Sequence, residues 1–103
     1  MLPSTLATSI LNLWEMRNKV IKPLEKELAR VEEEIAAADA RKAEISAELE
    51  KPENMADNQR LMELTQEYQE LERRSESLFT RWEDLSVEIE RKTAELAEEF
   101  GAE

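Results

Sequence analysis

The side chains that carry chemistry in this sequence are almost all carboxylates and cations. Histidine and cysteine are absent, which removes the usual general base, thiol nucleophiles, disulfides and the common zinc ligands. The acidic run at residues 32–34 attracts a cation only weakly, and a run of this kind usually forms a solvated helix face. The single glycine, Gly101, excludes a phosphate-binding loop, which needs several glycines. We therefore predict no enzyme activity in this chain, and no catalytic, cofactor-binding or metal-binding residue.

The chemistry that remains is contact with an anionic partner. Basic residues gather within residues 17–30 and again within 81–92, and clustered Lys and Arg are the electrostatic signature of such contacts. The alternative is that these cations pair with neighbouring Glu and Asp, as exposed charges on helices commonly do. The predicted partner-contact residues are Arg17, Lys19, Lys22, Lys26, Arg30, Arg81, Arg91 and Lys92.

The overall charge limits the class of partner. The 103-residue chain has 14 Lys and Arg against 25 Asp and Glu, which gives a formal net charge of −11. This balance disfavours a general affinity for nucleic acids or anionic membranes, so any nucleic-acid contact must be local. No apolar run approaches the roughly 20 residues needed to span a bilayer. We expect a cytoplasmic protein without a membrane partner.

Two long helices are predicted to position these residues. Apolar side chains recur every three or four residues within 24–49 and within 61–96, the spacing typical of coiled coils. Pro52 ends the first series, and Asn54 or Asp57 can cap the second helix by accepting a backbone N–H.

These signals predict an all-α chain that folds as one domain, residues 1–103, in the form of an antiparallel coiled-coil hairpin. Helix one is expected over about residues 5–50, the turn over 51–56, and helix two over about 57–100. Pro23 predicts a kink near residues 19–22, or a fresh helix start with this proline in the first turn.

Charge pairing predicts the register of the hairpin. Antiparallel helices bring the heptad g positions of both helices face to face. In this sequence every such pair is opposite in charge and has the same sum of residue numbers, whereas a shift by one heptad would oppose like charges. The pairs are Glu27 with Arg81, Glu34 with Arg74, Arg41 with Glu67, and Glu48 with Arg60.

The same register predicts the core. We interpret Trp82 as an apolar knob opposite Leu24, and its burial would contribute roughly 2–3 kcal/mol. The alternative roles for Trp82 are a platform for a ligand or a docking point for a partner. The predicted core residues are Leu24, Leu28, Ile35, Tyr68, Leu71, Leu78, Trp82 and Leu85.

The register also places two polar residues, Lys42 and Ser75, in core positions, where such residues commonly fix the alignment of helices. It sets Trp14 beside Lys92. The N-terminal segment is therefore expected to cover the end of the second helix.

Three segments of the chain resemble the C-terminal coiled-coil domain of ABC-F ATPases, the Uup-like proteins with tandem ATP-binding cassettes. They are RNKVIKPLEKELARVEEEI, AELEKPENMADNQRLMELTQEYQELE and LFTRWEDLSVEIE, and the resemblance covers about residues 17–92. Its most specific elements are Lys22-Pro23-Leu24, the short acidic turn, and Arg81-Trp82-Glu83.

The resemblance implies that this chain is a non-catalytic appendage of a larger ATPase that acts in translation. ATP and Mg²⁺ would then be bound by the cassettes of the parent protein, and the hairpin would contact the ribosome, nucleic acid or its own cassettes. The net acidity of this sequence disfavours the nucleic-acid contact.

Two other interpretations stay open at the level of sequence. The chain is alternatively a self-association module, which forms a homodimeric coiled coil or a four-helix bundle. A third interpretation is an enzyme arm analogous to the tRNA-binding hairpin of seryl-tRNA synthetase, which would be expected to carry a stronger basic stripe.

Overall fold

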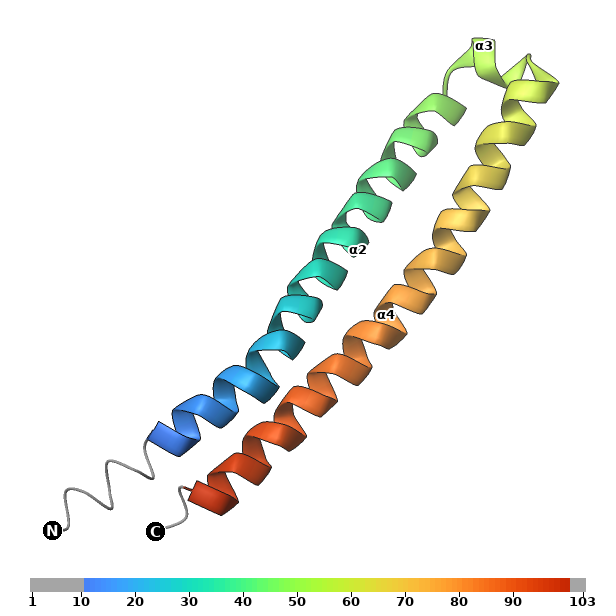
Figure 1. Ribbon diagram of the computed structural model, residues 1–103. Helices are drawn as coiled ribbons and strands as arrows, with labels where there is room; N and C mark the ends of the chain where they lie inside the picture. The colour runs from blue at the N-terminus through green and yellow to red at the C-terminus, as the bar shows by residue number, and fades with distance from the viewer. Residues whose placement is uncertain (1–10, 101–103) are drawn as a thin grey trace, which may run out of the picture. The chain divides into compact units, whose positions relative to one another are not determined.

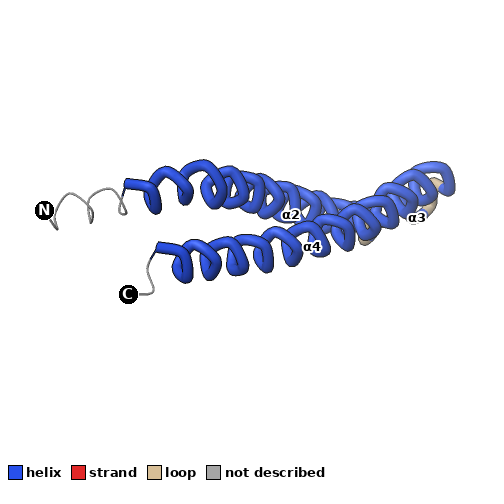
Figure 2. Tube along the Cα trace, turned by 60° about the horizontal axis from the view of Figure 1, so that its bottom comes forward, coloured by secondary structure: helices blue, strands red, loops and turns tan. Residues whose placement is uncertain are grey.

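The computed structural model of the protein describes residues 11–100, with side chains described for residues 11–99. These residues are helical apart from short loops on either side of α3, and no strand occurs among them (Figure 2). Residues 11–16 are α-helical, and they are followed by the π-helix η1 (Arg17–Ile21), α2 (Lys22–Leu49), α3 (Pro52–Met55) and α4 (Asn58–Phe100) (Figure 1). The predicted all-α class is confirmed. The predicted start of helix one near residue 5 lies outside the described residues.

The two long helices follow from residue type. α2 consists mainly of Ala, Glu, Leu, Lys and Arg, which are strong helix formers. Its buried residues Val31, Ala38 and Ile45 recur every seven positions and form one apolar row. α4 extends over 43 residues that include neither glycine nor proline, so nothing in its sequence interrupts the helix.

Pro23 explains the π-helix that precedes α2. Proline has no N–H to donate, and its ring would collide with the carbonyl group four residues earlier, that of Lys19. In η1 the N–H of Lys22 donates instead to the carbonyl of Arg17, five residues back, which is the wider π-helical pattern. A π-helix therefore stands where the sequence predicted a break or kink. The wider turn of this π-helix changes the direction in which the residues before it point around the helix axis, relative to α2.

Pro52 and Asn54 determine how α2 ends. Lys51, the residue before the proline, is extended with φ −76° and ψ 128°, because the proline ring disfavours helical geometry in its predecessor. The Nδ2 of Asn54 donates to the carbonyl of Glu48 at 2.8 Å and to Glu48 Oε2 at 3.0 Å. Hydrogen bonds from Lys51 and Asn54 lower the pKa of the Glu48 carboxyl.

Asp57 begins α4. Its Oδ1 accepts the N–H of Arg60 at 3.1 Å, which satisfies one of the free donors at the start of the helix. Of the two residues predicted to cap this helix, Asp57 does so. Asn54 does not, because its amide group is bound to the end of α2.

The chain divides into two compact units, which we describe separately. Unit 1 consists of Met1–Arg30 and Trp82–Glu103, and unit 2 consists of Val31–Arg81. In unit 1 the buried residues of the described part are Ile21, Leu85 and Leu96, and the first two are 1% and 0% exposed.

Unit 2 has a narrow core with one polar member. Its buried residues are Val31, Ala38, Ile45, Leu64, Ser75 and Leu78. Lys42 keeps 22% of its side chain exposed and places Nζ 3.5 Å from Asp39 Oδ1, so its aliphatic part is covered while its charge stays at the surface. Ser75 is only 5% exposed.

Two of the predicted ion pairs join α2 to α4 within unit 2. Arg41 makes a two-pronged contact with Glu67, with Nε–Oε2 and NH2–Oε1 distances of 2.5 and 2.8 Å, and this contact lowers the pKa of the Glu67 carboxyl. Arg74 NH2 lies 3.5 Å from Glu34 Oε1. These stretches of α2 and α4 lie side by side (Figures 1 and 2).

A third predicted pair does not form. Glu48 is occupied by Lys51 at 2.8 Å, and Arg60 contacts Glu63 at 3.8 Å. Each of the two residues thus has a partner close in sequence, which the heptad pattern alone did not reveal. The fourth pair, Glu27 with Arg81, stays a prediction.

The predicted core residues differ in burial. Leu78 and Leu85 are buried. Leu24, Leu28, Ile35, Tyr68 and Leu71 are half-buried. Trp82 is 37% exposed, so the prediction that it is a buried knob is wrong. Trp82 lies two heptads before the buried Leu96 in the same row of α4, so its exposure does not come from the row it occupies. Its indole ring is large enough to extend past that row into solvent.

Candidate interaction surface

The described residues offer no group that could hold a metal ion. No cluster of three or more His, Cys, Asp or Glu side chains with suitable geometry occurs within residues 11–99. The acidic run at 32–34 lies along one helix, where successive side chains point in different directions. The candidate site is instead a charged helix surface.

Residues 11–30 form a basic segment within an acidic chain. They contain five basic residues and three acidic ones, a local net charge of +2, whereas the whole chain has −11. The basic members are Arg17, Lys19, Lys22, Lys26 and Arg30. Because they lie on η1 and the first turns of α2, the helix that passes Pro23 fixes their spacing.

Three of these cations are fully available to a partner. Lys19, Lys22 and Lys26 are exposed. Within the described part of the chain, none of them has an acidic group within 4.0 Å of its ammonium group. Because no nearby carboxylate neutralises their charge, these ammonium groups attract an anion more strongly than paired ones would.

Arg17 and Arg30 are less available to bind an external anion, because each already faces a carboxylate. Arg17 lies 3.7 Å from Glu25, and Arg30 lies 3.8 Å from Glu27. Both arginine side chains are more than half exposed, and exposed pairs of this kind contribute only about 0–1 kcal/mol. An incoming anion can therefore compete with these carboxylates.

Lys26 and Arg30 also line a shallow surface depression, together with Pro23 and Glu27. In α2 the residues Lys22, Lys26 and Arg30 are spaced by four, so each is displaced by about 40° around the helix from the one before. Lys19, in η1, is exposed on the preceding turn. We call Lys19, Lys22, Lys26 and Arg30 the basic stripe.

The other predicted partner residues do not join this stripe in the structure. Arg91 and Lys92 both face Glu95, at 3.6 and 3.7 Å, so the intramolecular alternative holds for them. Arg81 belongs to unit 2 rather than unit 1, and it has an interaction of its own.

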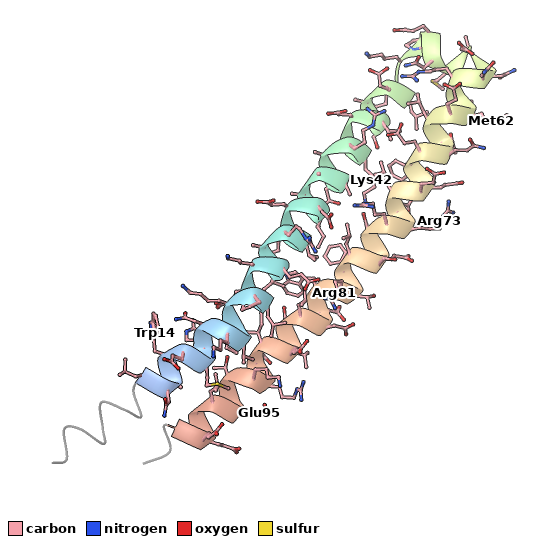
Figure 3. The ribbon with its side chains drawn as sticks, viewed as in Figure 1. Trp14, Lys42, Met62, Arg73, Arg81 and Glu95 are labelled. Atoms are coloured by element: carbon pink, nitrogen blue, oxygen red, sulfur yellow. The ribbon has the colours of Figure 1, made fainter. Side chains whose placement is uncertain are left out.

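Trp14 is an exposed aromatic residue of unit 1 that the sequence interpretation placed differently. It was predicted to cover the end of the second helix beside Lys92, yet its side chain is 64% exposed. Figure 3 shows Trp14 pointing away from α4. Pro23 is the sequence signal that could have revealed this, because a widened turn before a proline rotates the residues that precede it.

The described helices include no segment long and apolar enough to cross a membrane. Residues 22–87 match a family model, the ABC transporter C-terminal domain. That match covers more than half of the chain and includes Lys22-Pro23-Leu24 and Arg81-Trp82-Glu83. No curated protein and no solved structure matches the chain significantly.

Proposed function

Because the chain belongs to the family of ABC transporter C-terminal domains, we propose that it is the non-catalytic appendage of an ABC-F type ATP-binding protein that acts in translation. ATP and Mg²⁺ are bound by the cassettes of that parent protein, which is cytoplasmic. The appendage supplies a contact with the ribosome. Its lack of histidine and cysteine, and the absence of a metal-holding cluster among residues 11–99, support a role without catalysis.

The proposal gives the domain the form of an antiparallel coiled-coil hairpin. Two contacts support it: Arg41 with Glu67 and Glu34 with Arg74. As the residue number rises along α2, the number of its partner in α4 falls, which is the pattern of helices that run in opposite directions. The short connection through α3 also favours antiparallel neighbours.

One observation carries the proposed ribosome contact. Lys19, Lys22 and Lys26 are exposed and unpaired on one helix of a chain whose net charge is −11. A strongly acidic protein gains nothing in solubility from such a stripe. A local phosphate contact is the interaction that these cations favour, because it releases counterions without requiring the whole protein to be basic.

Cosedimentation tests the contact. The 103-residue chain is centrifuged with ribosomes at near-physiological salt, with duplex DNA as competitor, and the pelleted fraction is measured. We expect pelleting that survives the competitor. Lys22→Glu and Lys26→Glu should each reduce it, because each removes one phosphate contact and adds a repulsive charge.

Arg73→Glu is the matched control. Arg73 is exposed, lies on α4 in unit 2 (Figure 3), and makes the same change in net charge when reversed. It should leave pelleting unchanged. An equal loss for all three variants would mean that only total charge matters, and no pelleting at all would favour contact through the cassettes or self-association.

A further inference from the structure

Trp14 stands out among the exposed side chains of unit 1. The residue is 64% exposed, although a tryptophan in water forgoes a large apolar burial. It lies outside residues 22–87, the part of the chain that the family model matches. The family match therefore gives no information about the role of Trp14.

The π-helix determines what Trp14 faces. In an uninterrupted α-helix, residues 14 and 22 would lie about 80° apart around the axis, since 3.6 residues complete a turn. The wider turn of η1, closed by the Lys22 N–H on the carbonyl of Arg17, rotates the chain less per residue. This reduced rotation brings Trp14 close to the face that carries Lys22 and continues the basic stripe toward the N-terminus.

We propose that Trp14 and the basic stripe together bind a single-stranded segment of RNA, in which the indole stacks on an unpaired base and the lysines contact the flanking phosphates. This inference rests on the proposed ribosome contact and specifies the kind of RNA it involves. Exposed aromatic rings beside a cationic track are the combination that holds single strands, because every base has a stacking face whatever its sequence.

Charge and shape favour a single strand over the other anionic partners. A base in a duplex is already stacked on both faces, so Trp14 would add nothing to a duplex contact. An anionic membrane presents an extended surface, and the acidic remainder of unit 1 would be repelled by it: residues 82–103 contain eight acidic and two basic residues. A single strand is narrow enough to touch the basic stripe alone, whose α2 part extends about 12 Å from Lys22 to Arg30.

The chain offers a direct optical test. It contains two tryptophans, so Trp82→Phe leaves Trp14 as the only indole fluorophore. This variant, in the full 103-residue chain, is titrated with single-stranded oligoadenylate. Duplex RNA with the same number of phosphates and phosphatidylserine vesicles are titrated in parallel. We expect oligoadenylate to quench Trp14 fluorescence and to bind more tightly than the duplex.

Trp14→Ala, in the otherwise unchanged chain, isolates the stacking contribution through anisotropy of a labelled oligonucleotide. Its affinity for oligoadenylate should fall about 5- to 150-fold, the range expected for one base stacked on an aromatic ring, while its affinity for the duplex should not change. Val87→Ala removes a side chain of similar exposure, 63%, from α4 and should leave both affinities unaltered.

The outcomes separate this inference from the proposed function. If Trp14→Ala binds oligoadenylate as tightly as the parent chain while Lys22→Glu still weakens ribosome pelleting, stacking is overturned and the ribosome contact stands. If the chain neither pellets with ribosomes nor binds oligoadenylate, both are overturned. Binding to vesicles without binding to RNA would replace the RNA strand with a lipid surface.

Discussion

Ser75 shows at the scale of one residue how the interior of unit 2 departs from a purely apolar core. It is 5% exposed, and its Oγ has no hydrogen-bond partner among the described residues. A buried hydroxyl without a partner costs about 1–3 kcal/mol. The buried apolar residue Leu78 lies one turn away on the same helix, and its side chain offers the hydroxyl no hydrogen-bond partner.

Ser75→Ala is therefore expected to stabilise the protein, because it removes the unpaired hydroxyl and changes the volume little. The free energy of unfolding should rise by about 1 kcal/mol, measured by thermal or urea denaturation followed by circular dichroism. Thr65→Ala is the control, since the Oγ1 of Thr65 donates to the carbonyl of Leu61 at 2.8 Å and the residue is exposed. A decrease in stability for Ser75→Ala would show that its hydroxyl does have a partner.

A second prediction at the residue scale concerns how the stabilisation contributed by Glu67 depends on pH. Its contact with Arg41 lowers its pKa in the folded state. The stabilisation is therefore fully present above the pKa of the unfolded state, about 4.3, and is lost as the pH falls through the lower folded pKa. Glu67→Gln removes this dependence.

The difference in melting temperature between the parent chain and Glu67→Gln should thus be largest near pH 7 and should vanish in strong acid. Comparing the two chains at each pH cancels the effect of protonating the other carboxylates. A difference that stays constant from pH 7 to pH 2 would mean that Glu67 contributes nothing as an anion.

At the scale of the elements, the relative position of α2 and α4 in unit 2 depends on a few side chains placed one heptad apart. Arg41 contacts Glu67, and one heptad earlier in α2 Glu34 contacts Arg74. The apolar rows alone allow a shift by seven residues, because similar residues repeat at that interval. The charges oppose that shift, since it would bring like charges together.

Glu34→Arg should destabilise the protein, because it sets two guanidinium groups against each other across the helices. Adding Arg74→Glu should restore the stability, since the pair is then reversed but intact. Both side chains are partly exposed, so the expected effect is about 0.5–1 kcal/mol at low salt and less at high salt. A double-mutant cycle in urea denaturation measures the coupling, and absence of rescue would contradict the predicted register.

At the scale of the whole molecule, charge opposes association of copies. Each chain carries a net charge of −11, and like charges on two copies repel. The proposed hairpin would close its helix pair within one chain, so it would need no second copy to cover its apolar rows.

Sedimentation equilibrium at near-physiological salt should therefore give the mass of one chain, 12.0 kDa. The measurement is repeated at high salt, where repulsion between copies is screened. A dimer mass under both conditions would contradict this expectation and would favour the self-association alternative.

The helical class, the site of the turn, two contacts between α2 and α4, and the concentration of basic residues before residue 31 were all predictable from the amino-acid sequence. These depend on local rules: helix propensity, the backbone of proline, and charges at fixed heptad spacing. The family resemblance, confirmed over residues 22–87, also came from residues close together in sequence.

Features that depend on helix rotation, or on competition between possible partners of one side chain, became visible only in the folded chain. Trp14 is exposed because η1 changes the rotation of the first segment. Trp82 is exposed because its indole extends past a row in which the smaller Leu96, two heptads later, is buried. Glu48 binds Lys51 and Asn54 instead of Arg60 because the turn brings those donors closer. A heptad pattern gives the position of a residue along a helix, but its burial depends on the angle at which the folded chain holds that helix.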